Sequence, residues 1–249
     1  MTQRGAVWFI VALMGVLLSG CGLMRPSEEM RYRLTVEVET PQGLCTGSSV
    51  IEVRAVRNPD WVNPEGRGTR SSFRGEAAAI DLPGGKTLFA LPEGEDGGGS
   101  DAMNYPWLAF EGRLKNSKDI FEDFRHMRQW KNEVVEMPKY HIIDDYENGK
   151  PIHNMAPGYP MLVTFGDIND PKSVAHIDPA ALDKHFGAGV RLRRITLEVT
   201  DDAVTTGIEK RLVWLGKYFN KTFAGNRYAV DNSLPDSLTA GSFTTMKSK

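Results

Sequence analysis

Four residues with metal-binding side chains lie close together in the middle of the sequence. His141, Asp144, Asp145 and His153 fall within a segment that shows no sustained hydrophobic period. Imidazole nitrogens and carboxylate oxygens are plausible ligands for zinc or manganese. Neither an HExxH motif nor a pair of histidines at helical spacing accompanies them. The segment is therefore a candidate metal site of a hydrolase, and polar residues on a surface loop are the simpler interpretation.

A second set of oxygen ligands follows a short apolar segment. Asp167, Asn169 and Asp170 stand in the sequence GDINDP, at spacings that resemble those of a calcium-binding loop. The segment lacks the glycine and the closing glutamate of an EF-hand. We therefore expect a turn in which these side chains accept hydrogen bonds from the nearby backbone.

Two further motifs lack most of the pattern that their chemistry requires. Ser48 and Ser49 follow Gly47, but there is no G-x-S-x-G motif, and the neighbouring alternation places the two serines in or beside a strand. The glycines at 97–99 lack the lysine and the strand-to-helix context of a phosphate-binding loop. The sequence therefore predicts no catalytic residue, no metal ligand and no cofactor.

Aromatic side chains between residues 107 and 130 could line a groove for a small molecule. They are Trp107, Phe110, Phe121, Phe124 and Trp130. Aromatic residues at helical spacing are more typical of a hydrophobic core. A core is the preferred interpretation, and small-molecule binding stays open as an alternative.

The elements that position these residues begin with two predicted β-hairpins. Residues 32–39 alternate between apolar and polar side chains, and so do residues 48–56. The turn between them is expected at residues 41–43, which read Pro-Gln-Gly. A second hairpin is predicted from residues 74–82 and 86–91, around a Pro-Gly-Gly turn.

The second half of the chain predicts a mixture of strands and helices. Residues 161–165 and 195–199 are expected to form strands. An amphipathic helix is predicted over 116–131, with Asn116 or Ser117 as its cap. A short helix is predicted over 178–187, because Asp, Pro and Gly stand at its start, first turn and end.

A last helix is predicted to begin at Thr206, which forms a capping-box pattern with Glu209. Its apolar stripe consists of Ile208, Leu212, Leu215 and Phe219. Lysine and arginine surround this stripe, so a membrane-surface helix is the alternative. We expect the stripe to face the core, because the helix follows a strand whose apolar face must be covered.

The remaining segments are predicted to be loops or tails. Residues 58–72 and 93–101 are rich in glycine, proline or charge, and residues 133–159 have no sustained period. Residues 232–249 contain few large apolar side chains and are expected to form a flexible C-terminal tail. Strands that precede helices, without an internal repeat, predict a single α+β domain over 30–231, with a largely antiparallel sheet and several short helices.

Composition narrows the classes of function. The net charge is −2, so the chain lacks the basic excess that is typical of nucleic-acid binding. Charged residues at 25% and apolar residues at 41% are ordinary for a globular body. The sequence has two cysteines, Cys21 and Cys45. We expect Cys45 to be a partly buried structural thiol, with a reactive or intermolecular thiol as the alternative.

The N-terminus carries the pattern that is most specific in this sequence. Arg4 is followed by an uncharged segment at 6–18, and Leu18-Ser19-Gly20-Cys21 closes it. A positive end, a short apolar core and small residues are the parts of a secretory signal peptide. The last four residues resemble the lipobox of bacterial lipoproteins. That resemblance implies cleavage between Gly20 and Cys21 and a diacylglyceryl group on the Cys21 thiol.

This resemblance sets the expected organisation and location of the protein. Residues 1–20 are the predicted signal peptide, and residues 21–29 are a lipidated tether that holds the body close to a membrane. Gly22 is not the aspartate that retains many enteric lipoproteins in the inner membrane. The resemblance therefore implies the outer membrane, facing the periplasm.

The body itself resembles no family of known function. The preferred hypothesis is a non-enzymatic envelope lipoprotein that binds another envelope protein or a cell-wall component. A lipid-anchored, metal-dependent hydrolase and a small-molecule binding module are the alternatives.

Overall fold

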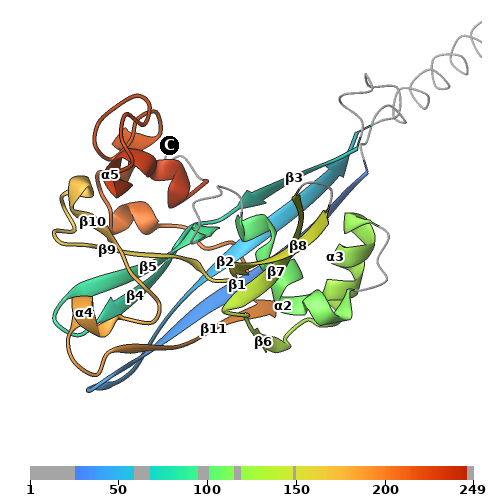
Figure 1. Cartoon of the computed structure of the whole chain (residues 1–249), viewed down its shortest axis with the longest axis horizontal. Helices are drawn as coiled ribbons and strands as arrows, with labels where there is room; N and C mark the ends of the chain where they lie inside the picture. Colours follow the sequence, from blue (N-terminus) through green and yellow to red (C-terminus); the bar gives the residue numbers. More distant parts are fainter. Residues whose placement is uncertain (1–25, 59–67, 95–100, 115–118, 148–149, 246–249) are drawn as a thin grey trace, which may run out of the picture. The chain divides into compact units, whose positions relative to one another are not determined.

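A computed structural model describes residues 26–58, 68–94, 101–114, 119–147 and 150–245 (Figure 1). The chain divides into two compact units, one of Met1–Ser27 with Val56–Arg70 and the other of Glu28–Ala55 with Ser71–Lys249. Within the first unit, the backbone N–H of Arg57 donates to the carbonyl of Pro26 at 2.9 Å. The second unit holds nearly all of the described strands and helices. The signal peptide and Cys21 lie outside the described residues.

A five-stranded sheet forms one layer of the fold. Its strand order is β3 (Thr69–Arg74), β2 (Gly43–Arg57), β1 (Ser27–Thr40), β11 (Arg191–Val199) and β6 (Val134–Glu136). The first predicted hairpin is confirmed as β1 and β2, joined by a turn at residues 41–42. The predicted strand at 195–199 is confirmed as part of β11, which pairs antiparallel with β1. Because β1 begins at Ser27, the last residues of the predicted tether belong to this strand.

Alternation along β1 separates a buried face from a charged face. Tyr32, Leu34 and Val36 are buried in the core. On the charged face, the Arg194 guanidinium contacts the Glu37 carboxylate across the β1–β11 pair at 2.8 Å. This hydrogen bond lowers the pKa of Glu37. The period of two therefore produces the half-buried strand that the sequence predicts.

A four-stranded sheet forms the middle layer. Its order is β10 (Val174–His176), β9 (Pro160–Phe165), β5 (Lys86–Gly94) and β4 (Ala78–Leu82). The second predicted hairpin is confirmed as β4 and β5, which pair antiparallel. Leu88 on β5 packs in one hydrophobic cluster, whereas its neighbour Phe89 packs in another. Both faces of this sheet are therefore covered, which explains why β9 is buried along its whole length.

Two helices cover the first hydrophobic cluster. They are α2 (Tyr105–Phe110), which lies between the 3-10 turns η2 (Asp101–Met103) and η3 (Glu111–Arg113), and α3 (Ile120–Gln129). Asp119 caps α3 by accepting hydrogen bonds from the N–H groups of Phe121 and Glu122. The predicted cap residues, Asn116 and Ser117, lie outside the described residues. Phe124 and Met127 are fully buried, as the predicted apolar stripe requires.

The C-terminal segment forms a third layer, on the face of the middle sheet that includes Phe89. Its elements are η5 (Ile208–Lys210), η6 (Leu215–Tyr218), α5 (Leu234–Ser237) and η7 (Ala240–Ser242). The predicted helix from Thr206 is wrong: short 3-10 turns replace it, and Gly207 precedes η5 without a side-chain cap. The predicted burial is confirmed for Ile208, Leu212 and Leu215. Packing in the second hydrophobic cluster buries these side chains, and short-range backbone bonds, such as that from the Leu212 N–H to the Ile208 carbonyl at 2.9 Å, hold the turns.

The expected flexible tail is folded over residues 232–245. Phe243 and Leu238 are buried in the second hydrophobic cluster. The backbone N–H of Ala77 donates to the Phe243 carbonyl at 2.8 Å, and the N–H of Thr245 donates to the Gly75 carbonyl at 3.1 Å. The sequence analysis underestimated this segment because its few apolar side chains are spaced irregularly.

Two further predictions differ from the structure. The helix at 178–187 is reduced to α4 (Asp183–Phe186), with η4 (Pro171–Ser173) earlier in the chain. Asp178 accepts a hydrogen bond from the Ala180 N–H in a turn that precedes α4. Residues 133–159 are not irregular, because they contain β6, β7 (Tyr140–Glu147) and β8 (Lys150–Pro157). The fold is therefore a largely antiparallel sheet protein with a few short helices, richer in strand than the predicted α+β class.

Candidate functional site

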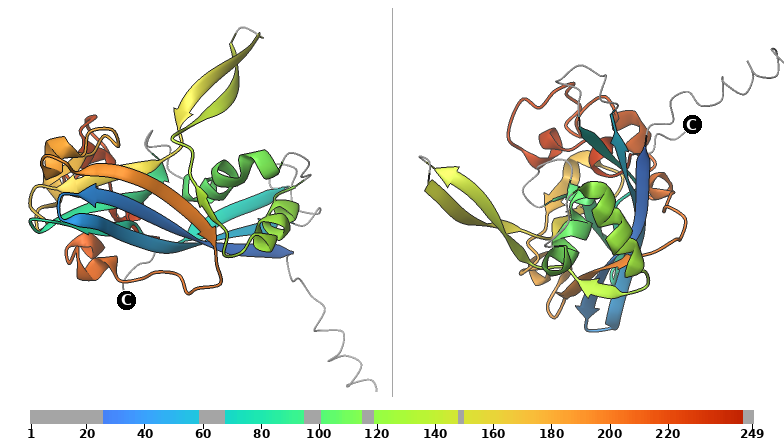
Figure 2. Two further views of the ribbon diagram at one scale, coloured as in Figure 1. Left: turned by 90° about the horizontal axis from the view of Figure 1, so that it is seen from below. Right: turned by 90° about the vertical axis from the view of Figure 1, so that its right-hand side faces the viewer.

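Strands β7 and β8 form a separate two-stranded sheet, which we call the β7–β8 hairpin. The strands pair antiparallel from Tyr140 opposite Pro157 to Glu147 opposite Lys150. Figure 2 shows the hairpin extending away from the two larger sheets in both of its views. Isolated two-stranded hairpins are only marginally stable in water. Because both of its strands are edge strands, the hairpin is a candidate for an interaction surface.

The base of the hairpin is fixed by a close backbone approach. The N–H of Gly158 donates to the Lys139 carbonyl at 2.9 Å. A Cβ atom at position 158 would lie 2.2 Å from the Pro138 carbonyl oxygen. Only glycine fits there without a backbone shift, because real Cβ atoms do not approach a backbone oxygen so closely. The direction in which the hairpin leaves the fold is therefore set at this point.

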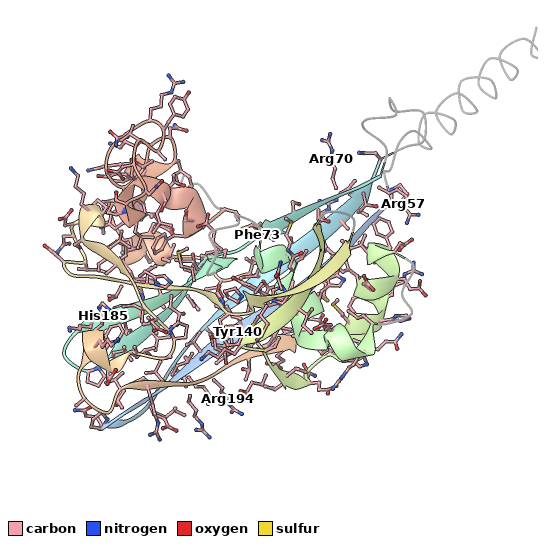
Figure 3. All side chains as sticks on the ribbon, in the orientation of Figure 1. Arg57, Arg70, Phe73, Tyr140, His185 and Arg194 are labelled. Carbon is pink, nitrogen blue, oxygen red and sulfur yellow. The ribbon has the colours of Figure 1, made fainter. Side chains whose placement is uncertain are left out.

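One face of the hairpin exposes apolar side chains to solvent. Ile142 and Met155 face each other across the strands and are 62% and 72% exposed. Tyr140, which lies on the same face and is labelled in Figure 3, is 49% exposed. On the opposite face near the base, Ala156 is buried and His141 is half-buried. The strand alternation thus gives this hairpin an inner side and an apolar outer side.

The four predicted metal ligands all lie on the hairpin, and among them the structure describes the side chain of His141. The register pairs Asp144 with His153. Within the described residues, no group of three or more histidine, cysteine or acidic side chains is placed to hold a metal ion. The side chains of Asp144, Asp145 and His153 lie outside the described part of the structure, so the metal set stays a prediction.

The other oxygen-bearing candidates have structural roles. Asp167 accepts a hydrogen bond from the Asn169 N–H at 2.9 Å, and Asp170 accepts one from the Lys172 N–H at 2.9 Å. The predicted turn is therefore confirmed. The Ser49 hydroxyl donates to the carbonyl of Glu76 at 2.7 Å and is buried.

The remaining candidates are either structural or outside the described part of the chain. Ser48 is exposed and lies on β2. Cys45 has a free thiol, is half-buried and packs against the first hydrophobic cluster, as expected for a structural thiol. The glycines at 97–99 lie outside the described residues.

The aromatic candidates belong to the hydrophobic core. The rings of Trp107 and Phe124 are 5.5 Å apart, and those of Phe110 and Trp130 are 5.0 Å apart. The Trp107 indole N–H also donates to the Asp123 carboxylate at 2.7 Å. Phe110, Phe121 and Phe124 are buried. The core interpretation is therefore confirmed for these three rings, whereas Trp107 and Trp130 are half-buried at the edge of the core and Trp107 lines a cavity of about 270 Å³.

A polar cavity of about 450 Å³ lies beside the base of the hairpin. Its lining includes Lys139, Tyr159, Arg191 and Arg193. Arg191 contacts Glu39 at 2.5 Å, and the Arg193 guanidinium lies 3.6 Å from Glu37. Glu37 is shared with Arg194, so the acidic partners offset only part of the positive charge that surrounds the cavity.

Glu76 and Asp236 are two buried carboxyl groups that the sequence analysis did not single out. The Ile208 N–H donates to the Glu76 carboxylate at 3.0 Å, and burial raises the Glu76 pKa. Asp236 is fully buried and accepts a hydrogen bond from the Thr222 hydroxyl at 2.9 Å. Both residues hold the C-terminal segment in place. No local sequence pattern marks either residue. The partner of Glu76 is far away in the sequence, and the partners of Asp236 lie in the irregular segment 222–231.

Comparisons with known proteins do not identify a relative of this chain. No protein-family model, no curated protein and no solved structure matches it significantly. In the described part of the chain, no helix is long and apolar enough to cross a membrane.

Proposed function

We propose that this protein is a lipid-anchored component of the bacterial cell envelope, and that its body is a non-enzymatic module that binds another envelope protein through the β7–β8 hairpin. The exposed cross-strand pair of Ile142 and Met155 is the observation that supports this function. Exposed apolar side chains that are contiguous on one face are typical of interaction sites. Isolated exposed residues elsewhere on the surface require no such explanation.

Water contacts the apolar face of the hairpin, and a partner that displaces this water gains free energy. Burying one large aliphatic side chain stabilises a complex by about 1.5–3 kcal/mol. Ile142 and Met155 are adjacent, so one partner surface can bury both. The outer edges of β7 and β8 also leave backbone groups available for pairing with an extended segment. The hairpin therefore combines an apolar face with strand edges that a partner can extend.

The hairpin is tested by retrieving the protein from detergent-solubilised membranes. We expect wild-type protein to retain a partner that the double variant Ile142→Ser with Met155→Ser loses. The control variant is Val213→Ser, because Val213 is 74% exposed and lies outside the hairpin. Equal retention by the hairpin variant and the wild type would contradict the proposed role of β7–β8.

The proposed membrane anchor depends on the lipobox and is tested separately. In this proposal the signal peptide at 1–20 is removed and the Cys21 thiol carries the lipid, so a fatty-acid probe labels the protein. Cys21→Ala is expected to abolish the labelling and leave a precursor or a mislocalised protein, whereas Cys45→Ala keeps the labelling. Labelling that survives Cys21→Ala would refute the anchor.

The proposed destination is the outer membrane, with the body facing the periplasm. The identity of Gly22, directly after the acylated cysteine, supports this destination. Density separation of the two membranes checks it, and recovery mainly with the inner membrane would contradict it.

A further inference from the structure

The loop at residues 220–233, which we call the Asp236 loop, is organised around one buried carboxylate. Asp236 accepts hydrogen bonds from the Asn226 side-chain amide at 2.8 Å and from the Asp231 N–H at 2.8 Å. The Thr222 hydroxyl and the Val230 N–H donate to the same carboxylate. Hydrogen bonds to a charged acceptor are stronger than those between neutral groups. The loop is therefore held in one conformation although most of its side chains are exposed.

A tight turn inside this loop brings two cations together. The Thr222 N–H donates to the Asn226 carbonyl at 2.7 Å, and the N–H of Gly225 donates to the Thr222 carbonyl at 2.8 Å. Gly225 has a φ of +97°, which glycine adopts without strain. Lys221 directly precedes Thr222, and Arg227 directly follows Asn226, so one basic residue stands on each side of the turn. Their charges are therefore held on neighbouring segments of chain.

Each of these cations lies over an aromatic ring. The Lys221 ammonium is 4.7 Å from the centre of the Tyr218 ring, and the Arg227 guanidinium is 5.4 Å from the Tyr228 ring. Tyr228 is 70% exposed, so its ring is available to a ligand. The loop thus presents two cation–aromatic pairs on a rigid base.

The segment that contains the loop is basic in an otherwise slightly acidic chain. Residues 208–233, which span the loop, include two acidic residues, Glu209 and Asp231, and five basic residues: Lys210, Arg211, Lys217, Lys221 and Arg227. Arg211 pairs with Asp81 at 2.6 Å. In the part of the chain that the structure describes, no ion pair involves Lys217, Lys221 or Arg227. These three charges are therefore free to attract an anion.

We propose that the Asp236 loop binds an anionic polysaccharide. The free cations match carboxylate or phosphate groups, and the exposed Tyr228 ring offers a flat apolar face on which a sugar ring can pack. Asn220 and Asn232 are exposed and supply amide groups for sugar hydroxyls. A loop that is already ordered loses little conformational entropy on binding. This inference is independent of the lipid anchor and of the β7–β8 hairpin.

The chemistry of the loop favours a polysaccharide over a bilayer surface. Membrane-surface elements expose bulky apolar residues such as leucine, phenylalanine or tryptophan beside their cations. The exposed residues at 225–233 are instead mostly glycine, asparagine, serine and charged residues, with Tyr228 and Val230 as the large apolar members. Hydrogen-bonding side chains suit a hydroxylated polymer better than a hydrocarbon interface.

The test measures binding of the full-length protein, purified in a neutral detergent, to polygalacturonate, a soluble chain of carboxylated sugars. Neutral dextran is titrated in parallel. The loop variant is Arg227→Gln with Tyr228→Ala. The matched control is Lys139→Gln with Tyr140→Ala, which removes one charge and one exposed ring from a pair 5.4 Å apart on the hairpin. Thermal unfolding of both variants shows whether each is folded.

We expect the wild type to bind polygalacturonate but not dextran. The loop variant should bind about tenfold more weakly, which corresponds to about 1.4 kcal/mol, while the control stays close to the wild type. Asp236→Asn should also weaken binding and make the loop easier to cleave with protease, because it removes the charge that orders the loop.

Three results would overturn the proposal. The first is no binding by the wild type, and the second is an equal loss in the loop variant and its control. The third is loop-dependent binding to mixed micelles of detergent and phosphatidylglycerol that polygalacturonate does not displace, which would assign the loop to lipid.

Discussion

The β7–β8 hairpin and the C-terminal segment at 208–245 differ in opposite ways from what their secondary structure suggests. The hairpin has regular strand pairing along its length, yet Ile142 and Met155 point to solvent. The C-terminal segment consists of short turns, yet Leu212, Phe223 and Phe243 are fully buried in it. Regular hydrogen bonding and contribution to the core are therefore separate properties in this molecule.

The two regions differ because different interactions stabilise them. The C-terminal segment covers a sheet face and surrounds a group of aromatic rings, in which Phe243 lies 5.7 Å from Phe89 and 5.6 Å from Phe223. Removal of apolar area from water is the dominant favourable term in folding. The hairpin satisfies its own backbone groups but leaves apolar area exposed. We therefore expect mutations to affect stability in the first region and binding in the second.

The largest predicted effect on stability is at Leu212. Leu212 is fully buried, whereas its neighbour Val213 is 74% exposed. Leu212→Ala is expected to leave a cavity and cost about 2–5 kcal/mol of unfolding free energy. Val213→Ala serves as the matched control and should change the unfolding free energy by less than about 0.5 kcal/mol. Denaturant unfolding measures both, and an unchanged midpoint for Leu212→Ala would place this segment on the surface.

Asp236 is predicted to make the stability of the C-terminal segment depend on acid. Hydrogen bonds, first from the Asn226 side chain and then from the Val230 backbone, lower its pKa from 3.8 to about 2. Because the folded pKa lies below the unfolded value, the ionised carboxylate stabilises the fold above about pH 4. This contribution is lost as the pH falls towards 2. Asp236→Asn should remove that acid-dependent part, and an identical pH profile in the variant would contradict the role of the carboxylate.

Glu76 is predicted to give stability the opposite pH dependence from Asp236, and the effect is expected to be smaller. Burial is the main reason why its pKa is raised from 4.5. Its favourable contribution is therefore fully present below pH 4.5 and is lost as the pH rises through the folded pKa. Glu76→Gln keeps an oxygen that can accept from the Ile208 N–H and removes the buried charge. We expect the variant to unfold at a higher temperature than the wild type at pH 8, and a lower temperature would contradict this interpretation.

The smallest predicted effect on stability is in the hairpin. Ile142→Ser with Met155→Ser replaces side chains that already contact water, so the unfolding free energy should change by about 0.5 kcal/mol or less. The same double variant is expected to lose the partner. Calorimetry of the isolated protein checks the stability. A large destabilisation would show that the hairpin face is part of the core and would remove the support for its proposed function.

Local sequence patterns predicted much of the sheet structure and of the buried core. The alternation over residues 32–39 gave the correct buried face of β1, and the apolar residues at 161–165 gave the buried strand β9. The spacing of Ile208, Leu212 and Leu215 predicted their burial, although the helix that was expected to carry them is replaced by turns. Burial follows from hydrophobicity at each position, whereas the backbone path also depends on the surface that the segment covers.

The candidate site was less accessible to sequence reasoning. Residues 140–157 mix apolar, acidic and proline residues without a period of two, and their one clear hairpin signal, Asn-Gly at positions 148–149 between β7 and β8, was missed. Their pairing requires hydrogen bonds between residues up to 17 positions apart, such as those that join Tyr140 to the Pro157 region. The candidate metal residues were therefore assigned to an irregular loop.

The sequence by itself determined the buried faces of β1, β9 and residues 208–215, where the first two hairpins turn, and the lipobox pattern at Cys21. The tertiary structure alone decided that residues 232–245 fold rather than fray, because Phe243 and Thr245 form backbone hydrogen bonds with Ala77 and Gly75, far away in the sequence. It also decided that Ile142 and Met155 remain exposed, because the close approach at Gly158 directs the hairpin away from the sheets. The hydrophobicity of each residue favours either burial or exposure. The packing of the whole chain then determines which apolar residues are buried and which stay exposed.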